Sequence, residues 1–321
     1  MKNELLYDNF IEEVRCRVPE NEKISNVLAD ILLIEKEAVY RRLRREVPFT
    51  FSEIAAICTK MRISLDCIIE SLPSTSRPCQ FIINEFIEPD EVNYKMMENL
   101  LDLFSMNQVY NKNEIGMCCN ILPQCIYLGY EHITKFIFFK WKSLYSKTKE
   151  TRPMSKLVFT DRMKNIQEEH HRAYRRLDHL VMIWDKNILK NLITDVNYFS
   201  TIRLVPKEEK NLLKEDIKKL IDDMEILAEK GKFDSGTKVD FYISNINFDT
   251  TAVYAENEMY NLGMIKTFTL NTVTTVDDYA YETIKSNIST VKRVSTLISE
   301  SGEQQRILFF DTQRELVETM M

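Results

Sequence analysis

The stretch NVLADILLIEKEAVYRRLRREV, residues 26–47, decides the fold expected for the N-terminal part of the chain. Apolar side chains in its first half share one helical face: Leu28, Ile31 and Leu32. In its second half, Val39 and Leu43 lie four residues apart, as they would on the buried side of a second helix. A short break at 33–35 separates the two halves. Two short helices joined by a tight turn predict a helix-turn-helix motif, whose second helix ends before Pro48.

The flanking residues predict further short helices around this motif. An amphipathic helix is expected over 3–17, because its apolar residues recur at spacings near one helical turn. Thr50 and Glu53 form a capping box that opens the next helix, and LDCIIE, residues 65–70, is expected to form a last one. Five short helices over residues 1–72 have the layout of a helix-turn-helix DNA-binding domain.

The segment from Leu28 to Asp66 resembles the helix-turn-helix domains of Cro/CI-type repressors. Its parts AVYRRLRREVPFTFSEI and RISLD are similar in particular to the BetR type of bacterial regulators. Ala29 stands at the small-residue position of the first motif helix, and Val39 at the anchor of the second. The chain departs from the pattern at Leu33, where the turn usually holds glycine, and at Arg42, where an apolar residue is usual. The resemblance implies that the second helix binds DNA.

YRRLRRE, residues 40–46, concentrates positive charge in a chain whose net charge is -6. Arginine binds DNA phosphates with release of counterions, and it pairs with guanine in the major groove. A helix that enters the groove by its N-terminal end brings its first residues to base edges and its later arginines to the phosphates. Helix N-termini, here expected to be capped by Ser25 and Thr50, also donate to phosphates. The predicted DNA-binding residues are therefore Ser25, Lys36, Glu37, Tyr40, Arg41, Arg42, Arg44, Arg45 and Thr50.

The arginine cluster also has a simpler interpretation, as a solvated helix face that pairs with nearby acids. The first 72 residues carry slightly more acidic than basic side chains, so the domain as a whole is not basic. This leaves open a helical N-terminal domain that binds another protein and not DNA.

Composition excludes several classes of protein. The chain has 321 residues, of which 44% are hydrophobic and 29% charged, as in a folding globular protein. With 6 glycines it has no GxGxxG, P-loop or GxSxG motif, which argues against those nucleotide enzymes and hydrolases. Acids interrupt the N-terminus and no apolar run is long enough for a membrane span, which predicts a cytoplasmic protein without membrane contact. Its 7 cysteines form no CxxC pair and are expected to be reduced, buried thiols.

The fold class expected is mainly α with a C-terminal α+β part. SLPSTSRPC, residues 71–79, has the composition of a connector, so the domains are predicted at 1–72 and 81–321, with a linker at 73–80. After residue 236, β-rich runs such as KVDFYIS and TAVYAE predict a small antiparallel sheet. QRILFFDTQRELVETM, residues 305–320, begins with an apolar run that fits a strand or a helix. Helices are expected over 91–106, 113–121, 130–146, 161–184, 187–199, 207–230 (closed by Gly231) and 279–299.

The chemistry-bearing residues of the larger domain assemble into no catalytic or metal-binding motif. EEHHRAYRRLDH places His170, His171 and His179 on one expected helix, and there is no HExxH. Cys118, Cys119 and Cys125 have no histidine near them in sequence. The chain is therefore not predicted to be an enzyme, and no cofactor or metal is expected. A pocket that brought His170 or His171 against acids distant in sequence would favour an enzyme.

The function predicted is that of a sequence-specific DNA-binding transcription regulator, with a C-terminal sensory or dimerisation domain that responds to an unidentified effector. Operators are commonly read as two half-sites by two symmetry-related helices, so a homodimer on double-stranded DNA is expected. The alternatives are a protein-interaction protein that uses its helical N-terminal domain, and an enzyme of another mechanism that this domain targets.

Overall fold

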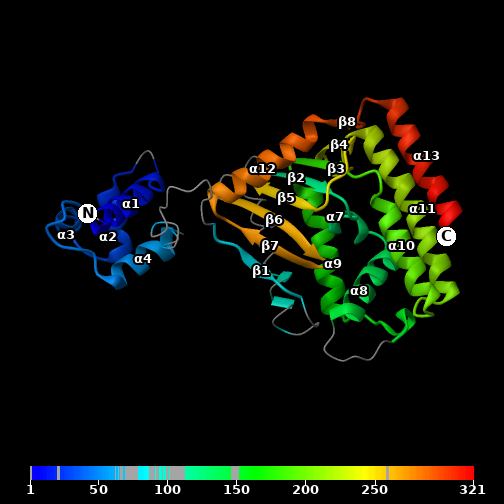
Figure 1. The fold of residues 1–321 in the computed structure, drawn as a ribbon, viewed down its shortest axis with the longest axis horizontal. Coiled ribbons are helices and arrows are strands. Elements are labelled where there is room, and N and C mark those ends of the chain that lie inside the picture. Colours follow the sequence, from blue (N-terminus) through cyan, green and yellow to red (C-terminus); the bar gives the residue numbers. More distant parts are fainter. Residues whose placement is uncertain are drawn as a thin grey trace. The chain divides into compact units, whose positions relative to one another are not determined.

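The chain divides into two compact units, Met1–Gln80 and Phe81–Met321 (Figure 1). The computed structural model describes residues 2–19, 22–61, 63, 65, 68, 79–86, 91, 94–95, 97–98, 101, 113–145, 152–257 and 260–321. Most of the predicted linker and of the helices expected at 65–70 and 91–106 lies outside these residues.

In the described part of the first unit, the helices α1 (Lys2–Cys16), α2 (Ile24–Leu32), α3 (Lys36–Leu43) and α4 (Phe51–Met61) pack around a small apolar core. Leu28 on α2, Val39 on α3 and Ile57 on α4 are fully buried in this core. Leu33 follows α2 in a left-handed conformation, with φ 55° and ψ 41°, and its N–H donates to the Ala29 carbonyl. The turn between α2 and α3 therefore has the backbone geometry that glycine favours, although a leucine occupies it.

The second unit is built on an eight-stranded mixed sheet, with strand order β1-β7-β6-β5-β2-β3-β4-β8 (Figure 1). The central strands β2, β3 and β4 are parallel, and the pairs on either side of them are antiparallel. The expectation of a mainly helical chain with a small antiparallel sheet is therefore wrong, and the class is α+β. The strands are β1 (Ile82–Asn84), β2 (Glu114–Cys119), β3 (His179–Trp184), β4 (Lys238–Ser244), β5 (Ala252–Glu256), β6 (Asn261–Phe268), β7 (Asn271–Thr275) and β8 (Ser295–Leu297).

Two predicted helices are central strands of this sheet. The helix expected over 113–121 is β2, and the last six residues of the helix expected over 161–184 are β3. After their first residues, EIGMCC and HLVMIW are buried throughout. A strand covered on both faces has no alternation of polar and apolar residues, so its sequence does not distinguish it from a buried helix.

Helices cover both faces of the sheet. On one face, Tyr281 and Ile284 of α12 pack against Tyr254 on β5 and Val181 on β3. The larger core lies on the other face, where residues of α8, α10, α11 and α13 pack on the strands. Among the described residues, no helix is long and apolar enough to cross a membrane. The helices are α7 (Gln124–Tyr127), α8 (Glu131–Tyr145), α9 (Asp161–Ala173), α10 (Ile188–Thr201), α11 (Lys207–Lys230), α12 (Asp278–Arg293) and α13 (Glu303–Met320), with 3-10 turns η2 (Met154–Lys156) and η3 (Tyr174–Arg176).

Candidate nucleic-acid interface and ligand pocket

The outer face of α3 carries most of the residues predicted to contact DNA. Val39 is fully buried, and its burial fixes which side of the helix faces the core. The exposed side carries one acid, one aromatic ring and three basic groups, from Lys36, Glu37, Tyr40, Arg41 and Arg44. The helix therefore presents both hydrogen-bonding and cationic side chains to solvent along its length.

Arg42 does not share this face, because its side chain turns toward α4. Its Nη2 donates to Glu53 Oε1 at 2.6 Å, its Nε donates to Glu53 Oε2 at 3.1 Å, and the two side chains are 15% and 17% exposed. The Arg42 hydrogen bonds hold the pKa of the Glu53 carboxyl below its ordinary value. The position that is usually apolar thus carries an arginine whose charge is neutralised inside the unit.

The other arginines of the cluster have acidic neighbours. Arg45 pairs with Asp8 on α1, and its guanidinium lies over the Tyr7 ring. Arg41 and Arg44 lie 3.6 Å and 3.9 Å from the Glu46 carboxylate, but both remain more than half exposed. Contacts of this kind at an exposed surface are weak, so both arginines can exchange Glu46 for a phosphate.

The two predicted capping residues differ in the structure. Thr50 caps α4 as predicted: its Oγ1 accepts from Glu53 N at 3.3 Å, and the Glu53 carboxylate accepts from Thr50 N at 2.8 Å. The prediction that Ser25 caps this helix is wrong, because α2 begins at Ile24 and Lys23 occupies its N-cap. Ser25 is buried within the helix, and its hydroxyl donates to the Tyr40 hydroxyl at 3.2 Å.

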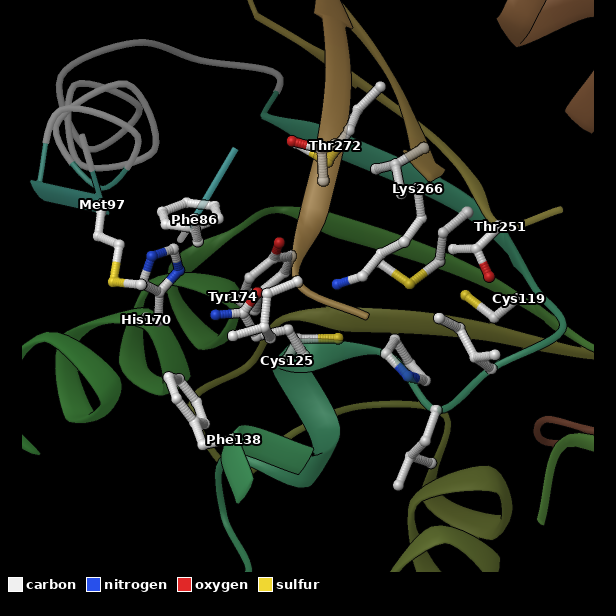
Figure 2. Close-up of a pocket in the computed structure, with 18 residues that line it drawn as sticks. Phe86, Met97, Cys119, Cys125, Phe138, His170, Tyr174, Thr251, Lys266 and Thr272 are labelled. Carbon is white, nitrogen blue, oxygen red and sulfur yellow. The ribbon is translucent and has the colours of Figure 1, made fainter. Parts of the chain in front are cut away.

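The second unit contains a pocket of about 830 Å³, its open mouth included, on the face of the sheet that α7 and α9 cover (Figure 2). Its lining is mainly apolar and comes from strands β2, β5, β6 and β7, from α7, α8, α9 and η3, and from Phe86 and Met97. The lining residues are Phe86, Met97, Met117, Cys119, Ile121, Leu122, Pro123, Gln124, Cys125, Phe138, His170, Tyr174, Thr251, Val253, Met264, Lys266, Leu270 and Thr272.

Lys266 is the cation of this pocket. It extends from β6 into the space between the labelled side chains of Figure 2, and burial lowers the pKa of its amine to about 8. Among the described residues, no carboxylate or hydrogen-bond acceptor pairs with its ammonium group. The nearby Thr251 and Thr272 hydroxyls are already engaged, with Asn120 and Asn84 respectively.

His170 provides a second polar atom in the pocket. It is 6% exposed, and its Nδ1 has no hydrogen-bond partner within the described part of the chain. Burial lowers the pKa of its imidazole to about 4, so the ring is neutral at physiological pH. His170 therefore lines the same pocket as Cys119 and Cys125, although no histidine lies near these cysteines in sequence.

The cysteines of this region are buried thiols, as predicted. Burial raises the pKa of Cys118 and Cys119, and it raises that of Cys125 to about 12. Over the residues that the structure covers, no group of three His, Cys, Asp or Glu side chains could hold a metal ion.

The three neighbouring histidines do not share one helix, so that prediction is wrong. His170 and His171 lie on α9, whereas His179 begins β3. Its Nδ1 lies 2.7 Å from Glu114 Oε2 and its Nε2 lies 3.2 Å from Asp240 Oδ2. Of these three histidines, His179 is the one that meets distant acids, and no acidic side chain is found among the described residues that line the His170 pocket.

Comparisons of the chain with protein-family models, with curated proteins and with solved structures return no match.

Proposed function

We propose that this protein is a sequence-specific DNA-binding transcription regulator, in which the first unit binds double-stranded DNA and the second unit binds an effector and forms a homodimer. The observation that carries the proposal is the geometry of α2, the left-handed turn at Leu33 and α3. In that arrangement Val39 anchors α3 to the core, and its exposed side carries groups that can read bases and bind phosphates.

The exposed groups divide by position along α3. Lys36, Glu37 and Tyr40 lie in its N-terminal part, which enters the major groove first in a helix-turn-helix. Arg41 follows as the candidate for guanine, and Arg44 as a candidate phosphate contact. Arg42 is held inside the unit by Glu53, so it positions the helix, whereas Arg45 pairs with Asp8 of α1 at the exposed surface.

The test is selection from randomised duplex DNA by the full-length protein, at two salt concentrations. Recovery of a two-half-site motif with a steep salt dependence supports the proposal. Arg41→Ala is expected to relax discrimination at one base pair by ~1–3 kcal/mol, and Arg44→Ala to weaken all sequences alike and lower the salt slope by about 1. Lys60→Ala removes the same charge from the exposed surface of α4 and should change neither property. If no sequence is enriched at low salt, either with or without effector candidates, the proposed DNA-binding function is contradicted.

A second candidate function, binding of another protein by the first unit, is favoured by two exposed apolar side chains. Leu33 is 90% exposed in the turn before α3, and Phe51 is 79% exposed at the start of α4. Under this alternative, replacement of Leu33 and Phe51 by serine abolishes partner binding, whereas Arg41→Ala leaves it unchanged. DNA binding should show the opposite pattern.

Effector control would operate through the segment that joins the two units. The second unit begins at Phe81, and β1 follows at once. Phe86, two residues beyond β1, lines the pocket, and its carbonyl accepts from Trp141 Nε1 at 2.5 Å. A ligand that binds more tightly to one conformation of this segment increases the population of that conformation. The conformation of the segment in turn affects how the DNA-binding units of the proposed dimer can be placed on DNA. A chain truncated after residue 80 is expected to bind DNA as a weak monomer.

A further inference from the structure

Within the part of the chain that the structure describes, Lys266 differs from other partly buried lysines of the second unit in having no anionic partner. Lys135 pairs with Glu209 at 2.9 Å, Lys140 pairs with Asp195, and Lys285 pairs with Glu256. Removing a cation from water without such a partner is costly, and this cost is usually offset by an opposite charge. A pocket that retains an unpaired ammonium group is therefore suited to a ligand that brings the negative charge.

The rest of the pocket requires an apolar ligand body. Around Lys266 its walls are formed by aliphatic and aromatic side chains, among them Met117, Leu122, Phe138, Val253 and Leu270. Two further methionines, Met97 and Met264, give the wall adaptable surfaces. No arginine is found among the described lining residues, so a dianionic phosphate would meet a single cation. A monoanion fits this lining better.

The unpartnered Nδ1 of His170 adds a second point of recognition. A hydrogen bond to the backbone of Met97 raises the imidazole pKa, as it does when the ring donates. Nδ1 of the neutral ring is then an acceptor. A ligand with a hydroxyl or amide N–H on its body can satisfy it.

We propose that this pocket binds a small monocarboxylate with an apolar body, whose carboxylate pairs with the Lys266 ammonium group. That the monocarboxylate acts as an effector rests on the regulator function proposed above, but its binding to the pocket does not. A failure of one proposal can therefore be distinguished from a failure of the other.

The described titratable groups that face Lys266 are uncharged near pH 7, so they do not compete with a carboxylate for its ammonium group. They are the thiols of Cys119 and Cys125 and, around the same pocket, Tyr174 and His170. Burial raises the pKa of the thiols and of the Tyr174 phenol and lowers that of His170, so all four are uncharged near pH 7. Lys140 and Asp195, which share a neighbouring cavity with Lys266, neutralise each other. Lys266 is thus the group whose protonation a carboxylate would change.

The experiment is calorimetric titration of the full-length protein, without DNA, with octanoate, with 4-phenylbutyrate and with uncharged octan-1-ol as the control. One carboxylate per chain is expected to bind, with proton uptake that grows from pH 7 to pH 8, measured in buffers of different ionisation enthalpy. This uptake follows because the bound carboxylate raises the pKa of an amine that is partly deprotonated beforehand.

Variants identify the residue. Lys266→Met should raise the carboxylate Kd at least tenfold, leave binding of octan-1-ol unchanged and raise the Tm, because an unpaired charge leaves the interior. Lys190→Met removes an exposed lysine from α10 and should do none of these. Lys266→Gln provides the same comparison if the methionine variant does not fold. Equal carboxylate affinity in the Lys266 variants, or no binding of either carboxylate at millimolar concentration, would overturn the proposal.

Discussion

Replacement of Leu33 by glycine is expected to stabilise the first unit by ~0.5–1 kcal/mol. The residue adopts φ 55° and ψ 41°, a conformation that costs a residue with a Cβ atom ~1–2 kcal/mol. Its side chain is 90% exposed, so truncation sacrifices little packing. Glycine has more freedom in the unfolded chain, which offsets ~0.5–1 kcal/mol of the relief and leaves the net gain given above.

Hydrogen–deuterium exchange of peptides that span residues 24–43 measures this change locally. Both tryptophans of the chain, Trp141 and Trp184, belong to the second unit, so their fluorescence monitors that unit as an internal reference. Exchange in the Leu33→Gly protein should slow by a factor of about 2–5, while the fluorescence-detected unfolding of the second unit stays unchanged.

Leu33→Ala is the matched control, because it removes the exposed side chain but keeps the Cβ atom. It should leave exchange close to that of the unmodified protein. If Leu33→Gly exchanges as fast as Leu33→Ala, the left-handed turn stores no recoverable strain and the account of the α2–α3 junction is wrong.

Two further predictions concern ionisable groups. Arg42→Met should destabilise the first unit by about 2 kcal/mol near pH 7, since it removes hydrogen bonds to a charged partner. Folding lowers the pKa of Glu53 from its ordinary value of 4.5, so the stability that the ion pair contributes is present above pH 4.5 and is lost as the pH falls through the folded-state pKa. Urea unfolding of both proteins at pH 7 and pH 3 should therefore show a smaller difference in the free energy of unfolding at pH 3. A difference that stays constant would contradict the ion-pair account. Maleimide labelling of the native protein at pH 7.5 should modify the exposed Cys16 but neither Cys119 nor Cys125, because burial raises the pKa of both pocket thiols. The sites of labelling are read by mass spectrometry. Rapid labelling of Cys119 and Cys125 would mean that the pocket opens widely.

The elements that sequence predicted well are those with local boundary signals. The helix expected over 207–230 is α11, and Gly231 closes it at φ 62° as predicted. KVDFYIS is β4, residue for residue. The ambiguity of residues 305–320 is resolved as one helix, α13. In the first two cases the signal lies in the segment itself, where a capping glycine or an alternating pattern marks the element.

The missed features depend on contacts between distant segments. β2 and β3 are strands because each forms backbone hydrogen bonds with strands on both sides. The local sequences EIGMCC and HLVMIW do not show that these partner strands exist. The pocket could not be predicted either, since Lys266 and His170 come from different elements and Phe86 from near the start of the unit. One signal was available: Lys266 stands among β-branched and aromatic residues in IKTFTLN, residues 265–271, and a charged residue inside such a run needs a special environment.

The pairing of β1 with β7 has a consequence for the order in which the chain folds. Ile82 lies opposite Thr274, so the sheet is incomplete until the last third of the chain is under way on the ribosome. Contacts between residues so distant in sequence form slowly, whereas short helices that contact near neighbours form fast. The pocket has the same requirement, because Phe86 and Thr272 both line it. The first unit is therefore expected to be folded, and able to contact its target, while the pocket proposed to control it is still being synthesised.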